Sequence, residues 1–234
     1  MKKILKFLAY AVLWIFIVSI ITVGIYEYHN KSRIDTITSQ YTHVTDNFYT
    51  DKPCNEETIS AMNEFIDTLP PIFVKEFRDD WFVIIEDQIP TPSSWPSNVS
   101  IDAYTHWQTR TIIIKNQDCD KMLNVFVHEI GHCFDFEYGS VSYSDIFHEI
   151  YETHRDTFLE QDPYATPRYA TASPVEFFAT CFKEYLLYPE HLKTEAPEAY
   201  NFIDLFYNNV LEMDHGYWYD LGAIANTLRR IAEG

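Results

Sequence analysis

The segment His128-Glu129-Ile130-Gly131-His132 constrains the fold of this chain more than any other feature of the sequence. Two histidines four residues apart lie on one face of a helix, where their imidazoles can share one ion. At 100° per residue, the neighbouring apolar side chains lie on the face of Ile130 and both histidines lie opposite. These apolar residues are Leu123, Phe126, Val127, Cys133 and Phe134. The pattern predicts a helix over residues 119–137 that buries one face and presents its imidazoles on the other.

A catalytic zinc ion also needs a third protein ligand and an open position for water. Two glutamates downstream are candidates. Glu152 follows His132 by 20 residues, a spacing that resembles thermolysin-like peptidases, and Glu176 follows it by 44. Glu176 also ends the segment Ser173-Pro-Val-Glu176, which is typical of a helix N-terminus in which the glutamate bonds the serine backbone. The spacing therefore leaves both glutamates open as ligands.

From His128 onward, the chain resembles the catalytic domain of the anthrax lethal factor family, which includes the secreted Pro-Pro endopeptidases of Gram-positive bacteria. The resemblance rests on the histidine motif followed by Asp135, on Tyr169 seven residues before Glu176, and on the segment Glu176-Phe-Phe-Ala179. Ala196-Pro followed by Tyr-Asn-Phe-Ile-Asp204 near the end adds to it. The family motif would place an acidic residue where this chain has Thr180. That difference puts in doubt any carboxylate role at this position.

The resemblance implies a zincin-like metallopeptidase that binds Zn²⁺ through His128, His132 and Glu176. In such a site, Glu129 acts as the general base toward a zinc-activated water, and the Tyr169 hydroxyl points at the reacting carbonyl. Asp135 lies on the histidine side of its helix and is a candidate acceptor for an imidazole N–H. The resemblance also implies that the strand at residues 111–115 pairs with an extended polypeptide substrate.

The N-terminus predicts a membrane segment. Lys2, Lys3 and Lys6 precede residues 7–26, a run of twenty residues without a charge that is long enough to span a bilayer. The positive charges should keep the N-terminus in the cytoplasm and place the rest of the chain outside. A signal peptide cleaved near Thr22-Val-Gly24 is the alternative, and it also exports the remainder of the chain. We expect an anchor at residues 1–26, a polar tether at 27–50 and a peptidase domain at 51–234.

The remaining pattern predicts an α+β fold in which a small mixed sheet precedes a helical half. Apolar residues at helical spacing predict a helix over residues 55–69, which the prolines at 70 and 71 end. Short β-branched runs at 81–85 and 111–114, with 100–107 between them, predict the sheet. Helices are expected at 119–137, 143–160, 173–187, 196–212 and 217–232.

Charge and cysteine content limit the partners. The net charge of −18 opposes binding to nucleic acid. The expected partners are a polypeptide substrate, which the resemblance implies, and the membrane, through the N-terminal segment. Four cysteines, at positions 54, 119, 133 and 181, lack the spacing of a zinc site, and they leave two disulfides or four free thiols open.

The competing function is a catalytically silent, membrane-anchored binding module that keeps the fold. The cleavage specificity and oligomeric state do not follow from the sequence.

Overall fold

The computed structural model describes residues 2–91, 101–164 and 169–210. The chain forms two compact units, Met1–His43 and Val44–Gly234. The first unit is dominated by one long helix, α1 (Lys2–Gln40). In the described residues, no helix combines the length and apolarity that crossing a membrane requires. The membrane-spanning segment within residues 1–26 stays a prediction from the sequence.

The second unit contains a five-stranded mixed sheet with the strand order β1-β2-β3-β5-β4. Its strands are β1 (Thr42–Thr45), β2 (Phe48–Thr50), β3 (Phe82–Glu86), β4 (Ala103–His106) and β5 (Thr111–Lys115). Strand β3 pairs in parallel with β2 and with β5, whereas β4 and β5 form an antiparallel hairpin. Two helices, α2 (Glu56–Ile66) and α3 (Pro71–Asp80), make the crossover between β2 and β3. Among the strands that the structure describes, β4 therefore ends the sheet on the side of the hairpin.

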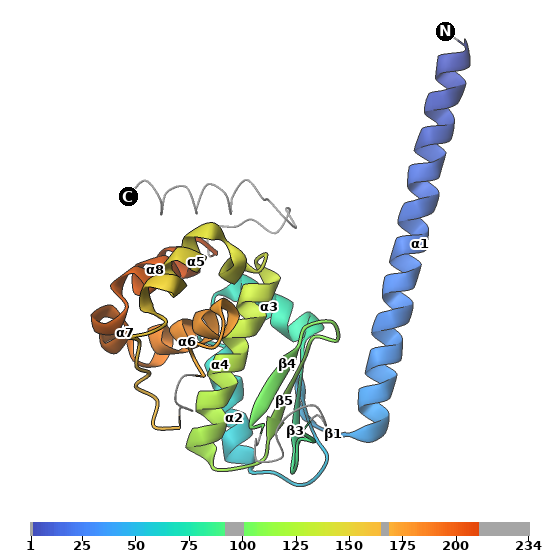
Figure 1. The fold of residues 1–234 in the computed structure, drawn as a ribbon. Coiled ribbons are helices and arrows are strands. Elements are labelled where there is room, and N and C mark those ends of the chain that lie inside the picture. The colour runs from blue at the N-terminus through green and yellow to red at the C-terminus, as the bar shows by residue number, and fades with distance from the viewer. Residues whose placement is uncertain (1, 92–100, 165–168, 211–234) are drawn as a thin grey trace. The chain divides into compact units, whose positions relative to one another are not determined.

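Helix α4 (Cys119–Glu137) lies between the sheet and the helices that follow it in the chain (Figure 1). It follows β5 directly, and the Asp118 side chain caps it by accepting a hydrogen bond from the Asp120 N–H at 3.1 Å. Its apolar face is fully buried, including Phe126, Ile130 and Phe134. The apolar stripe of the sequence is thus the reason that α4 forms the centre of the domain.

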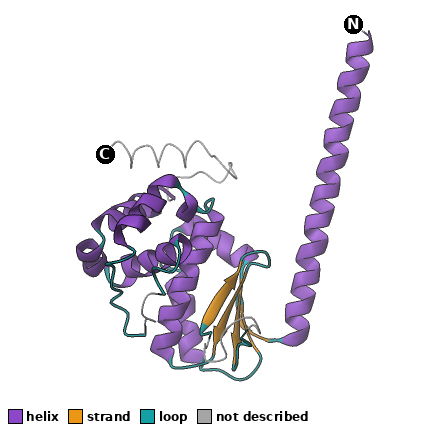
Figure 2. Cartoon of the chain, in the orientation of Figure 1, coloured by secondary structure: helices purple, strands orange, loops and turns teal. Residues whose placement is uncertain are grey.

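Among the described residues, the helical half consists of four helices and one short 3₁₀ turn at Val141–Tyr143. The helices are α5 (Asp145–His154), α6 (Pro174–Leu187), α7 (Pro189–Glu195) and α8 (Pro197–Val210). They gather on one side of α4, away from the strands (Figure 2). The Phe134 ring connects these layers, because its centroid lies 5.3 Å from that of Phe73 on α3 and 4.8 Å from that of Phe182 on α6.

The structure confirms the α+β class and the helix predicted at 119–137, and it adds elements that the sequence pattern did not show. Helix α3 starts at Pro71, which the sequence analysis treated as the end of the preceding helix, and α7 starts at Pro189, between the helices predicted at 173–187 and 196–212. A proline fits the first turn of a helix, where its missing N–H would have no partner inside the helix. Strand β2 lies within the predicted tether and joins the sheet because Phe48 is fully buried. The helix predicted at 217–232 lies outside the described residues.

All four cysteines lie in the described residues and are free thiols, so neither of the two possible disulfides is formed.

Candidate metal centre

The site depends on the close approach of α4 and α6. Gly131 faces Ala179, and a Cβ atom added at Gly131 would lie 2.9 Å from the Ala179 Cα. A Cβ atom so close to a neighbouring backbone atom would clash in a packed core. The absence of a side chain at Gly131 therefore lets the backbones of α4 and α6 approach each other. The contact falls between the two histidines of α4 and one turn beyond Glu176 of α6. Glycine in the histidine motif and alanine in the Phe-Phe-Ala segment therefore set the distance between the two helices.

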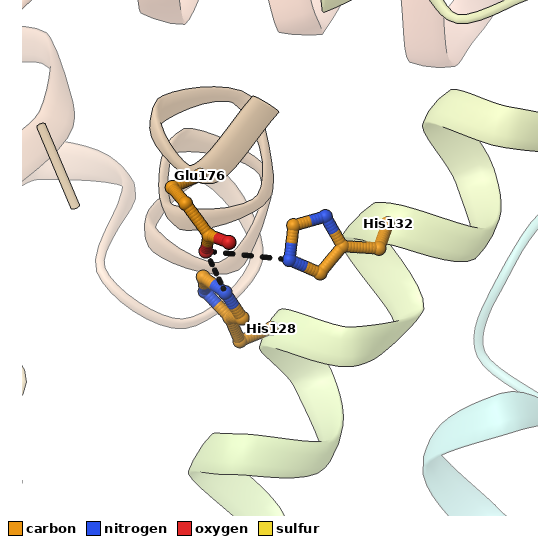
Figure 3. A group of neighbouring side chains, drawn as sticks. All are labelled: His128, His132 and Glu176. Atoms are coloured by element: carbon orange, nitrogen blue, oxygen red, sulfur yellow. Dashed lines mark hydrogen bonds and ion pairs between the residues drawn. The ribbon is translucent and has the colours of Figure 1, made fainter. Parts of the chain in front are cut away.

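Three side chains converge across this contact. Glu176 Oε2 lies 3.2 Å from His128 Nε2 and 3.4 Å from His132 Nε2. The two imidazole rings stand nearly perpendicular at 86°, with centroids 4.8 Å apart (Figure 3). In the part of the chain that the structure describes, this is the group of three His, Cys, Asp or Glu residues that could hold a metal ion, and its ligand atoms lie within 4.8 Å of one another.

The spacing fits a zinc ion. Zinc bonds of about 2.0–2.2 Å in a tetrahedron place neighbouring ligand atoms about 3.3–3.6 Å apart. The separations of 3.2 Å and 3.4 Å from the carboxylate oxygen match the edges of such a tetrahedron. Two imidazoles and one carboxylate are also a donor set that zinc prefers and that leaves one position for water. The distances of the carboxylate oxygen from both imidazoles are therefore compatible with a shared zinc ion.

The charge of the cluster favours the ionised carboxylate. Burial alone would raise the pKa of Glu176, but hydrogen bonds with His128 and His132 outweigh it and hold the pKa well below its usual range. For His132, burial acts to lower the pKa, whereas the hydrogen bond to Glu176 and the charges of Glu129 and Glu176 raise it above its usual value. The negative field at the cluster thus favours a cation.

Thr180 faces the other side of the first imidazole. Its hydroxyl lies 3.4 Å from His128 Nδ1, and the residue is 1% exposed. An acceptor at Nδ1 favours the tautomer that leaves the Nε2 lone pair for a metal. Thr180 therefore occupies the position at which the family motif implies a carboxylate, and it presents a hydroxyl there instead.

Glu129 lies beside the cluster and is 5% exposed. Its Oε2 accepts a hydrogen bond of 2.6 Å from the Thr105 hydroxyl on β4. It does not join the two histidines at Glu176, because its position on α4 directs it toward the sheet. The carboxylate is thus held at the junction of helix and edge strand, near His132 and Tyr169, whose pKa values its charge raises.

Tyr169 also reaches the cluster. Its ring centroid lies 6.1 Å from that of His128, although the side chain is 46% exposed. Desolvation, together with the negative charges of Glu176 and Glu129 and a hydrogen bond with Glu176, raises the pKa of Tyr169. The phenol therefore keeps its proton at neutral pH and can donate a hydrogen bond.

Two residues considered from the sequence have other partners. Glu152 lies on α5, where it pairs with Arg155 at 2.9 Å, and the structure does not bring it to the cluster. Asp135 is buried, but its carboxylate accepts hydrogen bonds from the Ser142 N–H at 2.8 Å and the Ser142 hydroxyl at 2.6 Å. The predicted acceptor for an imidazole N–H therefore anchors the loop after α4 instead.

The Ser173 segment does begin a helix. The Ser173 hydroxyl accepts the Glu176 N–H at 3.2 Å, while the Glu176 carboxylate turns to the imidazoles. Only the backbone of Glu176 takes part in the cap, so the cap and the metal cluster are compatible. Sequence reasoning missed Thr105 because its link to Glu129 spans 24 residues and two elements. Gly131 and Ala179 both belong to motifs that the sequence analysis singled out. The sequence pattern does not indicate, however, that these two motifs contact each other in the fold.

The sequence pattern of the family described as "Anthrax toxin lethal factor, N- and C-terminal domain" matches residues 90–206, which is 117 of the 234 residues. The chain belongs to this lethal factor family. The match runs from before β4 into α8 and thus includes every member of the cluster. Membership implies a metallopeptidase fold and a metal ion, typically zinc.

Among solved structures, the Pro-Pro endopeptidase PPEP-2 from Paenibacillus alvei is similar, with 19% sequence identity and a TM-score of 0.48. The similarity covers 67% of this chain and 94% of that protein. A search of the curated proteins gave no match to this lethal factor family member.

Proposed function

We propose that this chain is a zinc-dependent endopeptidase of the gluzincin type, with two histidines and a glutamate as ligands. The convergence of His128, His132 and Glu176 within 4.8 Å carries the proposal. Membership of the lethal factor family supports the peptidase class. Glu129 and Tyr169, which lie next to the cluster, supply groups that a silent binding module would not need.

The chain's own residues suit hydrolysis. A zinc ion bound by such a set lowers the pKa of a water toward neutrality and polarises a carbonyl. The Glu129 carboxylate accepts the proton of the attacking water and then passes it to the leaving amine nitrogen. The Tyr169 hydroxyl, which remains protonated because its pKa is raised, donates a hydrogen bond to the oxygen that develops negative charge.

The substrate is proposed to add a strand to the sheet at β4. The sequence analysis placed this role on residues 111–115, and that prediction is wrong, because β5 lies between β3 and β4 and has both edges paired. Strand β4 ends the sheet in the described residues, and it packs against α4. An extended polypeptide at this edge would pass next to Glu129.

The test uses the full chain loaded with zinc and a mixed peptide library, with cleavage products read by mass spectrometry. We expect about one zinc per chain and cleavage that falls roughly 10²–10⁴-fold in Glu129→Gln, which keeps the ligands but removes the base. Zinc binding without cleavage of any peptide would contradict the endopeptidase and favour the binding module. Cleavage that persists unchanged in Glu129→Gln would contradict the assigned base.

We propose from the sequence alone that the peptidase unit acts outside the cytoplasm on an extracellular polypeptide. The three lysines at positions 2, 3 and 6 precede the uncharged run, an order that favours export of the rest of the chain, either with the run retained or after its cleavage. Added protease should digest the unit on intact cells. A unit that resists digestion until the cells are lysed would contradict this location.

A further inference from the structure

The edge strand contacts the proposed base through one hydroxyl group. Thr105 Oγ1 donates to Glu129 Oε2 at 2.6 Å, and its distance to the Glu129 backbone oxygen is 3.4 Å. The Glu129 side chain is almost fully buried. In the described residues, Thr105 is the side chain that donates a hydrogen bond to this carboxylate. The loss of this hydroxyl would therefore leave a buried carboxylate without that partner.

The neighbouring thiol belongs to the same contact. Burial raises the pKa of Cys133, which lies one turn after Glu129 on α4, and a hydrogen bond with Thr105 acts against that rise. Thr105 is therefore close to Cys133 as well as bonded to Glu129 on α4. Its hydroxyl has a defined position, as a group that positions another must have.

The backbone of Thr105 points in a different direction. The Lys115 N–H donates to the Asp102 carbonyl at 2.8 Å, so residues 102, 104 and 106 bond toward β5. In an antiparallel pair the residues between them direct their N–H and C=O groups away from the partner strand. Ala103 and Thr105 therefore present their backbone groups to the open edge, where the proposed substrate strand would pair.

We infer that Thr105 is a positioning residue for Glu129 and that it connects substrate pairing to the placement of the base. Its side chain holds Oε2, which leaves Oε1 for the attacking water. Its backbone lies at the edge that binds the peptide, so the register of the substrate and the orientation of the carboxylate are set by one residue. The inference rests on the proposed endopeptidase function and adds a residue to it.

The hydroxyl is tested by variants that differ in that group. Thr105→Val keeps the shape of the side chain and removes the donor, whereas Thr105→Ser keeps the donor. We expect Thr105→Val to lower kcat roughly 10–100-fold, the loss of one hydrogen bond to a charged group, with KM within about twofold. Zinc content per folded chain should stay at the wild-type value, and Thr105→Ser should recover kcat to within about threefold.

A matched control lies on the adjacent strand. Thr111→Val makes the same change on β5, where the hydroxyl donates to the Thr109 carbonyl at 3.0 Å, and it should leave kcat unchanged. If Thr105→Val does not fold, Thr105→Ala and Thr105→Ser, which differ by one hydroxyl, replace the comparison. A crystal structure of zinc-loaded Thr105→Val should show the Glu129 carboxylate displaced from its wild-type position.

The outcomes separate the two proposals. A wild-type chain that binds zinc but cleaves no peptide overturns the endopeptidase and this inference together. An active wild type with an equally active Thr105→Val overturns only the role of Thr105. A Thr105→Ser variant as slow as Thr105→Val also overturns it, because the hydroxyl would then not be the cause.

Discussion

The two ends of helix α6 carry buried polar clusters of opposite character. At its N-terminus, Glu176 Oε2 is shared by two imidazole nitrogens at 3.2 Å and 3.4 Å. Toward its C-terminus, Lys183 and Glu184 each have their own partners within the chain. The same helix holds both clusters, although the Glu176 side chain is 23% exposed and the Lys183 side chain 4%.

The C-terminal cluster satisfies itself. Lys183 is 3% exposed and donates to Glu160, and also to Asp162 at 2.6 Å. Glu184 is fully buried and accepts the Gln161 N–H at 2.7 Å and His191 Nδ1 at 2.9 Å. Every acid in this cluster therefore has a donor, and the segment at 160–162 is fastened to α6. Such a cluster has a structural role.

In the N-terminal cluster, the imidazoles offer no donor to Glu176 Oε2 when they take the tautomer that ligates metals. With a proton on Nδ1 of each ring, two imidazole lone pairs and one carboxylate oxygen point at the same place. Converging acceptors of this kind need a cation between them, and the measured spacings suit zinc. The comparison indicates that a structural polar cluster supplies a donor for every acceptor, whereas a metal-binding cluster directs several acceptors at one point.

The largest expected effect follows from removing the acidic ligand. Glu176→Gln keeps the Ser173 cap, which uses the backbone N–H, but replaces an anionic oxygen with a neutral amide. Zinc affinity should fall by more than the roughly 100-fold that the loss of an outer partner costs. Elemental analysis and competition with a chelator measure this. Glu152→Gln is the control, and loss of zinc there with retention in Glu176→Gln would overturn the assignment.

Removing the cation of the C-terminal cluster should lower the free energy of unfolding and leave zinc binding unchanged. Lys183→Met leaves Glu160 and Asp162 without their cation, and the free energy of unfolding should fall by about 3–5 kcal/mol. Urea denaturation of the apo chain measures it. Zinc content per folded chain should remain that of the wild type. A loss of zinc without a loss of stability would show that the two clusters are not separate.

The difference in the free energy of unfolding between the wild type and Lys183→Met should depend on pH. Burial acts to lower the pKa of Lys183, but the charges of Glu160 and Asp162 outweigh it and raise the pKa above its usual value of 10.5. The folded state therefore holds the proton at pH values where the unfolded chain loses it. The stabilisation by Lys183 should be complete below about pH 10.5 and disappear as the pH rises through the folded-state pKa. A difference from Lys183→Met that shrinks already near neutral pH would contradict it.

The smallest effect is expected at Thr180, which contacts the metal cluster through His128 alone. Thr180→Val removes the hydroxyl at Nδ1 and keeps the volume, so the imidazole loses the group that selects its tautomer. Zinc affinity should weaken about 10-fold, at the low end for an outer partner, with Tm of the apo chain little changed. Isothermal titration measures the affinity. An unchanged affinity would mean that the 3.4 Å contact does not act on the metal.

Local pattern was sufficient for helix α4, because a nineteen-residue amphipathic segment with its histidines on one face has one stable arrangement. It failed at Pro71 and Pro189, where a proline can end one helix or begin another and only packing decides. It also placed Phe48 in a tether, since three residues carry too little pattern to predict a strand that a neighbouring strand completes.

The sequence by itself determined the identity of the cluster. The four-residue spacing of His128 and His132 follows from helix geometry, and the resemblance singled out Glu176 and Tyr169. The tertiary structure decided which groups lie across from them, because sheet order and helix contact join residues that are distant in sequence. Pairing of β5 on both sides moved the open edge to β4, and the Gly131–Ala179 contact set the metal spacing. Thr105 reaches Glu129 for the same reason, since no local pattern records which strand a helix will pack against.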